Sequence, residues 1–407
     1  MRAAIILLSI AILSPSLSNA KDFWEQTNGP NFGYIKSLVI NSSGHIFAGT
    51  GAGVFRSIDN GDSWTSANTG LTRLVITCLA INTNGYVFAG TDDGGVFCST
   101  DKGDNWTPIG MKNIWVISLA INSSGHIFAG TQSGGVYRST DNGDNWRPVG
   151  LTNNGVVSLA INSSGHIFAG TNGNGIFRST NNGDSWTPIN TGLTDASVWS
   201  LIINSSGHVF AGTYDGGVFR SMNNGDGWTP INNGLTTAWT ISLAINSNGH
   251  IYAGTFNGGV FRSIDNGDNW TPINNGLTNP YVWSLAINSG GRIFAGTASG
   301  GVYRSIQSTT DVKKINKELP FPFELRQNYP NPFNSSTTIK YSLYKSYFVT
   351  INIYNLYGQE IETLISCHQT AGEHQIRWIA ESYPSGRYFY RFQAGEFSET
   401  KQFLLQK

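Results

Sequence analysis

The sequence of 407 residues has little charge and no excess of either sign. Lysine plus arginine and aspartate plus glutamate each number 25, so the formal net charge is zero. A chain without a basic stripe cannot neutralise a run of phosphates, and we therefore expect no nucleic-acid partner. Charged residues make up only 12%, whereas glycine numbers 49, which indicates many tight turns.

Cysteine is scarce: Cys78, Cys98 and Cys367 are the only three. The repeat described below places Cys78 and Cys98 on the first and third strands of one unit. Strands that are next but one lie about 9–10 Å apart, beyond the reach of a disulfide. We therefore predict that all three cysteines are unpaired and serve as small apolar residues.

Long apolar runs are absent beyond the first 20 residues. Arg2, an apolar core from Ala3 to Leu13 and the small residues Ser18-Asn19-Ala20 have the form of a secretory signal peptide cleaved after residue 20. The alternative is a membrane anchor, but the apolar core is too short to cross a bilayer. We expect no membrane span after cleavage.

Against these absences, an Ala-Gly-Thr triplet recurs every 40 to 42 residues. Its threonines are Thr50, Thr91, Thr131, Thr171, Thr213, Thr255 and Thr297. In the sixth copy, apolar segments 239–245, 250–255 and 259–263 are separated by Asn/Gly turns, and a fourth segment starts at Trp270. Four short strands with a period in the low forties predict a β-propeller blade.

The spacing of tryptophans predicts how the ring closes. Trp64, Trp106, Trp146, Trp186, Trp228 and Trp270 each precede the next triplet threonine by 25–27 residues. The seventh copy ends at residue 306 without such a tryptophan, but Trp24 lies 26 residues before Thr50. We predict an all-β, seven-bladed propeller over residues 21–306, whose seventh blade takes its outer strand from residues 23–26 and leaves no open edge.

A shaped turn of pattern Ser-x-Asp-x-Gly-x-x-Trp, hereafter the Asp-box turn, precedes each of these six tryptophans. Its third position is Asp59, Asp101, Asp141, Asn181, Asn223 or Asp265. Here the chain resembles the Asp-box propellers, a group that includes sialidases, sortilin-like domains, photosystem-assembly propellers and xyloglucan hydrolases. The resemblance implies a structural turn, in which the carboxylate caps backbone N–H groups. Acids are too sparse for a Ca²⁺ cage, so we expect no metal and no cofactor.

The resemblance to sialidases raises the question of catalysis. Sialidases need three converging arginines, but here the arginines share one repeat position: Arg56, Arg138, Arg178, Arg220, Arg262 and Arg304. The histidines also share one position, and glutamate is absent between Glu25 and Glu318. A glycosidase needs two carboxylates. Asp92, Asp93 and Asp215 on one face could provide them, which keeps a glycoside hydrolase or lyase as the alternative to a non-catalytic protein.

Residues that vary between blades identify the candidate binding face. They lie in the connections that lead into first strands and in those between second and third strands. The candidates are Tyr34, Asp92, Asp93, Trp115, Trp199, Tyr214, Asp215, Trp239, Phe256, Tyr281 and Trp283. Aromatic platforms interspersed with polar groups suit sugars or peptide chains. The equally weighted alternative is that these rings fill the wedges between blades.

After a linker over residues 307–322, the C-terminal segment changes pattern. It contains Asn-Tyr-Pro-Asn-Pro-Phe-Asn (328–334), Gly358-Gln359 after an apolar strand, and a final strand containing Lys401. Alternation of apolar and polar residues predicts about seven strands in a small Ig-like β-sandwich, with Trp378 and Tyr388 in its core. Residues 323–407 resemble the type A C-terminal sorting domain of the type IX secretion system of Bacteroidetes-related bacteria. The resemblance implies export through the periplasm to the cell surface or beyond, with the secretion machinery as partner.

Three hypotheses follow from the sequence. The first is a secreted or surface-displayed, monomeric recognition protein that binds a glycan or a protein on its loop face. The second is an extracellular glycoside hydrolase or lyase that uses aspartates of that face. The third is a structural propeller without a specific ligand, which the near-identity of the blades favours.

Overall fold

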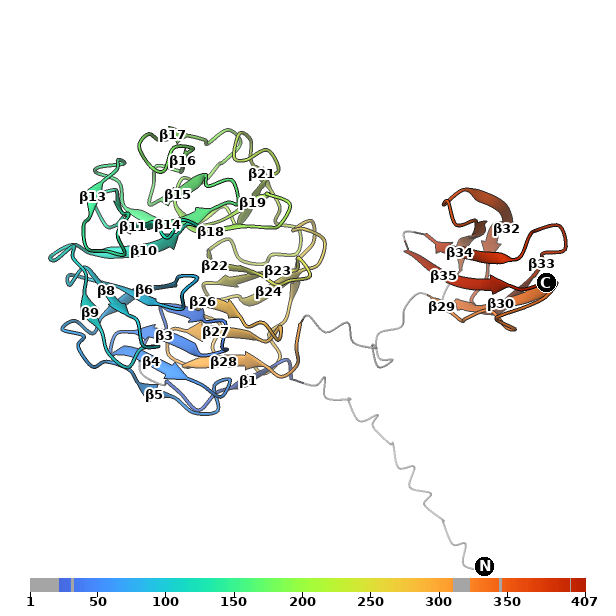
Figure 1. The fold of residues 1–407 in the computed structure, drawn as a ribbon, viewed down its shortest axis with the longest axis horizontal. Helices are drawn as coiled ribbons and strands as arrows, with labels where there is room; N and C mark the ends of the chain where they lie inside the picture. The colour runs from blue at the N-terminus through green and yellow to red at the C-terminus, as the bar shows by residue number, and fades with distance from the viewer. Residues whose placement is uncertain (1–21, 31–32, 310–322, 344–345, 396) are drawn as a thin grey trace, which may run out of the picture. The chain divides into compact units, whose positions relative to one another are not determined.

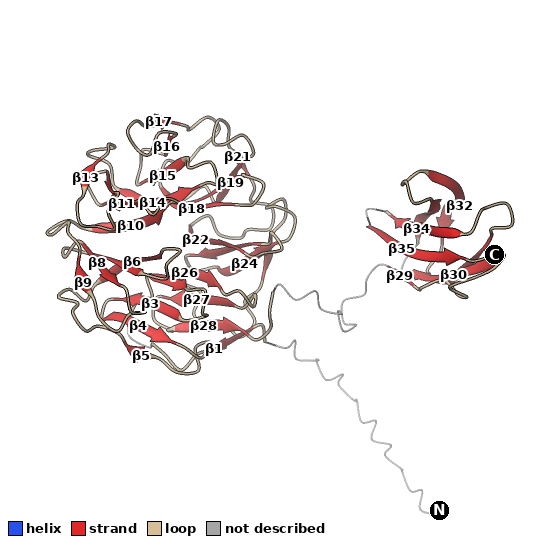
Figure 2. Ribbon diagram, viewed as in Figure 1, coloured by secondary structure: helices blue, strands red, loops and turns tan. Residues whose placement is uncertain are grey.

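A computed structural model describes residues 22–30, 33–309, 323–343, 346–395 and 397–407. These residues form strands and turns and include no helix (Figure 2). They divide into two compact units, a ring of small sheets and a C-terminal sandwich, and each is described by itself. The predicted signal segment and most of the predicted linker lie outside the described residues.

The first unit contains seven four-stranded antiparallel sheets arranged around a common centre (Figure 1). We number these blades one to seven by their innermost strands. The innermost strand of each blade packs beside those of both neighbours, and blade seven packs beside blade one, so the ring is closed. The innermost strands are β2 (Ser37–Ile40), β6 (Ile76–Ile81), β10 (Val116–Ile121), β14 (Val156–Ile161), β18 (Val198–Ile203), β22 (Thr240–Ile245) and β26 (Val282–Ile287).

The second strands, which end in the Ala-Gly-Thr triplet, are buried along their whole length. A Cβ on Gly49 would lie 2.7 Å from the Ile76 side chain of the next blade, so glycine permits the blades to approach. The Thr50 hydroxyl donates to the Gly53 carbonyl at 2.9 Å and closes the following loop. The second strands are β3 (Ile46–Thr50), β7 (Val87–Thr91), β11 (Ile127–Thr131), β15 (Ile167–Thr171), β19 (Val209–Thr213), β23 (Ile251–Thr255) and β27 (Ile293–Thr297).

The third strands and the short fourth strands complete each blade. In blades two to six the fourth strand contains a proline, which lies on the outer edge. The third strands are β4 (Gly53–Ser57), β8 (Val96–Ser99), β12 (Val136–Ser139), β16 (Ile176–Ser179), β20 (Val218–Ser221), β24 (Gly259–Ser263) and β28 (Val302–Ser305). The fourth strands are β5 (Thr65–Ser66), β9 (Thr107–Pro108), β13 (Arg147–Pro148), β17 (Thr187–Pro188), β21 (Thr229–Pro230), β25 (Thr271–Pro272) and, in blade seven, β1 (Trp24–Gln26).

The N-terminal strand β1 completes the last blade. It pairs antiparallel with β28, with Trp24 opposite Ser305. The Trp24 side chain is 1% exposed, and its indole N–H donates to the Ile273 carbonyl of blade six at 2.5 Å. Trp106 makes the equivalent bond to the Ala67 carbonyl at 2.8 Å. Trp24 therefore takes the place of an Asp-box tryptophan, which is the arrangement that its spacing predicts.

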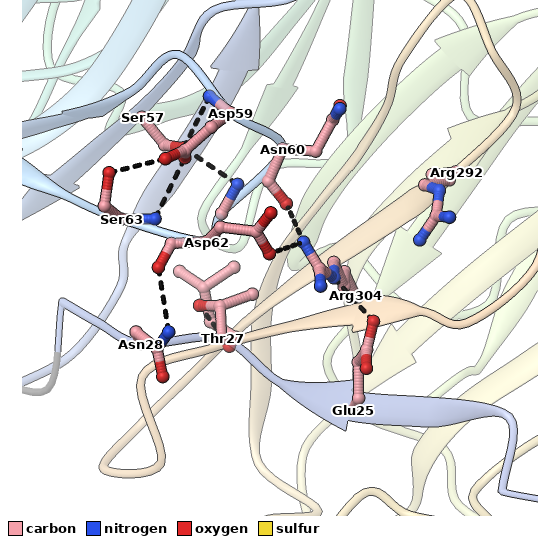
Figure 3. A network of polar contacts seen from close by, with 12 residues as sticks. Glu25, Thr27, Asn28, Ser57, Asp59, Asn60, Asp62, Ser63, Arg292 and Arg304 are labelled. Atoms are coloured by element: carbon pink, nitrogen blue, oxygen red, sulfur yellow. Dashed lines mark hydrogen bonds and ion pairs between the residues drawn. The ribbon is translucent and has the colours of Figure 1, made fainter.

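Ion pairs cross the closing joint between the last and first blades. The Arg304 guanidinium on β28 lies 2.6 Å from Glu25 on β1 and 2.6 Å from Asp62 in the Asp-box turn of blade one (Figure 3). The same guanidinium donates to the Asn60 carbonyl at 2.8 Å. One side chain thus joins the N-terminal strand, the last blade and the first blade.

The propeller's hydrogen bonding continues past residue 306, where the sequence predicts the linker to begin. Ile306 N–H donates to the Phe23 carbonyl at 2.9 Å. Thr309 N–H donates to the Gly291 carbonyl at 2.7 Å, and the Asn246 carboxamide donates to the Thr309 carbonyl at 3.1 Å. Residues 307–309 therefore belong with the propeller.

The second unit is a sandwich of two sheets, ordered β29-β30-β33 and β32-β31-β34-β35. Trp378 is fully buried and Tyr388 is 5% exposed, so both lie in the core as expected. Its seven strands, the predicted number, are β29 (Phe323–Leu325), β30 (Ser336–Leu343), β31 (Tyr347–Tyr354), β32 (Glu360–Gln369), β33 (Gly372–Ile379), β34 (Gly386–Ala394) and β35 (Phe397–Leu405).

Candidate functional site

The Asp-box turns bind their own backbone. In blade one, the Asp59 carboxylate accepts from Ser63 N–H at 2.9 Å and from the Ser57 hydroxyl at 2.8 Å, and Gly61 N–H donates to the Ser57 oxygen at 2.8 Å. Hydrogen bonds from the side chain and backbone of Ser63 lower the pKa of Asp59 to about 2. This carboxylate is used within the turn, in the capping role expected from the sequence. The described residues contain no group of three His, Cys, Asp or Glu side chains that could hold a metal.

Five of the third-strand arginines tie their blade to the next one. Arg178, for example, donates to the Asn224 carbonyl at 2.6 Å and pairs with Asp226 at 2.8 Å, both in the next Asp-box turn. Because these five arginines are bound to five different turns, they do not gather at one site as a sialidase would need. The ion pairs of this kind are Arg56–Asp104, Arg138–Asp184, Arg178–Asp226, Arg220–Asp268 and Arg304–Asp62.

Two of the five repeat histidines contact the next blade, whereas the buried Nδ1 atoms of His45, His126 and His250 have no hydrogen-bond partner among the described residues. A ring nitrogen of His166 lies 2.9 Å from the Asn224 carboxamide nitrogen, and His208 makes the same contact with Asn266 at 3.1 Å. Burial, followed by the charges of nearby basic side chains, lowers the pKa of His45. These contacts support the structural interpretation of the histidines.

The opposite face of the ring carries the variable residues, and we call it the loop face. It contains the loops between second and third strands and the connections from each fourth strand to the next first strand. In blade six, Phe256 N–H donates to the Trp239 carbonyl at 3.0 Å, and in blade five Tyr214 N–H donates to the Ser197 carbonyl at 3.0 Å. These bonds extend the sheets by one step and place the two sets of loops side by side.

Five of the predicted aromatic residues form one connected group on blades five to seven, which we call the aromatic cluster. The Trp239 ring is its hub, stacked on Phe256 at 4.2 Å between centroids and packed against Tyr214 at 4.5 Å and Trp199 at 5.9 Å. Tyr281 of blade seven joins through Phe256 at 4.8 Å. Tyr214 is 48% exposed, and the other four rings are partly buried.

The remaining aromatic candidates lie outside this cluster. Tyr34 and Trp283 form a separate pair at 5.5 Å between blades one and seven. Trp115 of blade three is 44% exposed and has no aromatic neighbour among the described rings. The indole nitrogens of Trp199, Trp239 and Trp283 are covered and have no hydrogen-bond partner among the described residues. The tryptophans therefore pack between blades, as one sequence interpretation holds, while Tyr34, Trp115 and Tyr214 present exposed rings.

A cleft of about 460 Å³ lies at the aromatic cluster, between the loops of blades five and six. Asp195 positions the wall of this cleft: its carboxylate accepts from Asp215 N–H at 2.5 Å, Gly216 N–H at 3.1 Å and Ser197 N–H at 2.9 Å. The cleft is lined by Tyr214, Asp215, Thr236, Thr237, Ala238, Trp239, Phe256, Asn257 and Gly258.

The loop lengths also break the symmetry of the ring. Seven residues connect the preceding fourth strand to β10 and to β14, whereas nine connect to β6, β18, β22 and β26. In the longer connections an asparagine fixes the loop: Asn190, Asn232 and Asn274 accept from the N–H of Ile176, Val218 and Val260, respectively, at 2.7 to 2.8 Å. All three blades of the aromatic cluster follow such a long connection.

The candidate catalytic acids lie on blades that are not neighbours. Asp93 pairs with Arg73 at 2.8 Å, and both side chains are 53% exposed. Asp92 and Asp93 belong to blade two, whereas Asp215 belongs to blade five, and two blades separate them along the shorter arc of the ring. Sequence reasoning missed Thr236, Thr237 and Asn257 in the lining of the cleft and Asp195 as the residue that holds its wall. The nine-residue connections could have drawn attention to Asp195, Thr236 and Thr237, but not to Asn257, which lies in a loop between second and third strands.

Comparisons with known protein families agree with this architecture. Residues 21–154 and 78–198 match the model of the DUF6242 beta propeller domain in two overlapping registers, as a repeat allows. Residues 327–406 match the model of the secretion system C-terminal sorting domain. The C-terminal unit is a type IX secretion sorting domain. No curated protein matches the sequence significantly.

The sorting domain indicates export to the cell surface or the extracellular space, with the type IX machinery as the partner of this unit. The described part of the chain contains no helix long and apolar enough to span a bilayer. In the sorting domain, Asn355 fixes the turn between β31 and β32, because its side-chain oxygen accepts from Tyr357 N–H at 2.9 Å and from Gln359 N–H at 3.1 Å.

Solved structures resemble the chain in fold at low identity. The extracellular domain of a protein described as a hybrid two-component system of B. thetaiotaomicron matches with a TM-score of 0.63 and 14% identity over 95% of this chain and 58% of that one. PorZ, a surface component of the type IX secretion system of Porphyromonas gingivalis, matches with a TM-score of 0.56 and 14% identity over 93% of this chain and 60% of that one. YCF48, solved with a D1 peptide, matches with a TM-score of 0.60 and 17% identity over 71% of this chain and 97% of that one. The chain thus spans under two thirds of the first two proteins.

Proposed function

We propose that the protein is an exported, non-catalytic recognition propeller that binds a glycan or a protein through the aromatic cluster of its loop face. The observation that carries this proposal is the asymmetry of that face. Five connected rings and a cleft lie on blades five to seven, although the strands of all seven blades are nearly identical. A purely structural ring needs no such departure from its repeat, and exposed aromatic groups beside a cleft are typical of binding sites.

Both ligand classes are compatible with a propeller. YCF48 was solved with a peptide bound. A protein named as a xyloglucanase from Xanthomonas campestris resembles this chain with a TM-score of 0.61, and this chain covers 59% of it. At 15 to 17% identity these likenesses concern the fold alone. The ligand of this chain has to be argued from its own residues.

The hydrolase alternative has less support. The propeller has no glutamate between Glu25 and the linker. Asp93 is paired with Arg73, and Asp195 is bound to backbone N–H groups. A pair of catalytic carboxylates must lie within about 10 Å of each other across the scissile bond, and the aspartates of blades two and five belong to blades that are not neighbours.

A binding screen with the full-length protein tests the proposal. The wild type, Tyr214→Ala and the control Trp115→Ala are applied to a glycan array and to surface proteins, with release of reducing sugar measured in parallel. Trp115 is the matched control because it is similarly exposed but lies outside the aromatic cluster. We expect binding that Tyr214→Ala weakens and Trp115→Ala does not. Binding to no ligand contradicts the proposal, and sugar release abolished by Asp93→Ala or Asp215→Ala replaces it with the hydrolase.

A further inference from the structure

The walls of the cleft carry hydroxyl, carboxamide and carboxylate groups but no cation. Asp215 and Asn257 occupy the same loop position in blades five and six, and both are exposed. Neither side chain makes a hydrogen bond within the described part of the chain. Thr236 and Thr237 lie on the connection between them. A site lined by one carboxylate and no Lys, Arg or His repels an anionic ligand.

The backbone N–H groups of residues 214–217, on the blade-five wall of the cleft, are already hydrogen-bonded. Tyr214 N–H donates to the Ser197 carbonyl, the N–H groups of residues 215 and 216 donate to the Asp195 carboxylate, and Gly217 N–H donates to the Ala238 carbonyl at 2.9 Å. None of the residues that line the cleft belongs to a strand, so no strand edge opens on it. A peptide that binds by strand addition needs such an edge with free backbone donors and acceptors, and these loops do not provide one. Recognition here must come from side chains.

The remaining groups match the chemistry of a sugar. A pyranose presents an apolar C–H face, which packs on an aromatic ring, and a rim of hydroxyls, which donate to carboxylates and exchange hydrogen bonds with carboxamides and threonines. Tyr214 offers the exposed ring, and Asp215 and Asn257 of the same cleft offer the free polar groups. The aromatic cluster continues through Phe256 to Tyr281, so the surface is longer than the cleft itself.

We propose, on the basis of the binding function above, that the cleft takes a neutral glycan chain. Tyr214 stacks on one sugar ring, and the Asp215 carboxylate and the Asn257 carboxamide bind its hydroxyls. Asp195 is a positioning residue, because it holds the loop that presents Tyr214 and Asp215. Acidic glycans are excluded by Asp215 and by the absence of a cation in the lining.

Titration calorimetry with the full-length protein tests this inference. The probes are the neutral hexasaccharides of glucose, mannose and xylose, a hexagalacturonate as the acidic glycan, and an unstructured uncharged peptide of similar length. The variants are Tyr214→Ala and Asp215→Asn, with Asp93→Asn as the matched control. Asp93 has the equivalent loop position in blade two, outside the aromatic cluster. Circular dichroism of each variant verifies that the fold is retained.

We expect at least one neutral hexasaccharide to bind, with affinity lowered about tenfold by Tyr214→Ala, which removes a stacking ring. Asp215→Asn should weaken binding by a smaller factor, and Asp93→Asn should leave it unchanged. If the peptide or the hexagalacturonate binds in a Tyr214-dependent manner and no neutral glycan does, the ligand class is wrong but the binding function stands. If no probe binds in a Tyr214-dependent manner, the inference is overturned, and the array screen then decides whether the binding function stands.

Discussion

Replacement of Trp24 by alanine tests whether the N-terminal strand closes the ring. The side chain is 1% exposed, and its N–H bonds to the Ile273 carbonyl of blade six. A buried tryptophan removes roughly 200 Å² from water, which at about 25 cal/mol per Å² is about 5 kcal/mol. Measured substitutions of buried Phe or Trp by Ala cost about 3–5 kcal/mol. We therefore expect Trp24→Ala to lower the free energy of unfolding of the propeller by about 3–5 kcal/mol.

The matched control is Trp106→Ala, because Trp106 of blade two contacts the connection that leaves the fourth strand of blade one. Trp106 is 3% exposed and donates to the Ala67 carbonyl at 2.8 Å, so its surroundings resemble those of Trp24. If β1 is an integral strand, the two variants should lose similar stability. If β1 were a frayed terminus, Trp24→Ala would cost less than about 1 kcal/mol.

Equilibrium urea unfolding followed by far-ultraviolet circular dichroism measures both variants in the full chain. The sandwich is identical in the two and serves as an internal reference. A loss below about 1 kcal/mol for Trp24→Ala, beside a loss of several kcal/mol for Trp106→Ala, would refute the closure by β1. Loss of two-state behaviour in Trp24→Ala alone would show that blade seven unfolds separately, and would support the closing role in a different form.

Other predictions concern the turns and the thiols. Hydrogen bonds lower the pKa of the Asp59 carboxyl from 3.8 to about 2 in the folded protein. The ionised carboxylate therefore contributes its full stability above about pH 4, and this contribution is lost as the pH falls through about 2. The urea midpoint should drop over this range, and it should drop less in Asp59→Asn. Lys102 has a left-handed φ of 63°, where the other Asp-box turns have asparagine. Lys102→Asn should therefore raise the free energy of unfolding by about 0.5 kcal/mol, and with it the urea midpoint. A lower midpoint would contradict this. Burial raises the pKa of Cys78 to about 12 and that of Cys98 to about 11, whereas Cys367 is exposed. A thiol reagent at pH 8 should therefore label only Cys367, which mass spectrometry would verify. Rapid labelling of two or three thiols would contradict this prediction.

The architecture was largely predictable because the repeat is strict. The triplet spacing and the position of Trp24 indicate seven four-stranded sheets and their closure, and the strands follow that pattern. The sandwich was predictable from alternation and motifs, and its seven strands and buried Trp378 agree. The hydrogen bonds of Thr309 to Gly291, beyond the predicted propeller end at residue 306, depend on contacts that no local pattern encodes.

The candidate site was only partly predictable. The positions of Tyr214, Trp239 and Phe256 in variable loops predict that they share one face of the ring, and their rings are in contact. Which rings touch depends on the order of blades around the ring and on the long connections before β18, β22 and β26. The ion pair of Asp93 with Arg73 likewise joins a loop between second and third strands to a connection that leads into a first strand. Sequence spacing alone could not distinguish such a paired carboxylate from the unpaired one of Asp215.

The central claim is that binding resides in the aromatic cluster and not in the repeated features of the ring. Hydrogen–deuterium exchange of the full-length protein, with and without a saturating neutral glycan that the calorimetry identifies, tests this claim most directly. The account predicts slowed exchange in the loops around residues 195–199, 214–217, 236–239 and 256–258. Protection confined to the Asp-box turns, or to the loops of blades two to four, would contradict it.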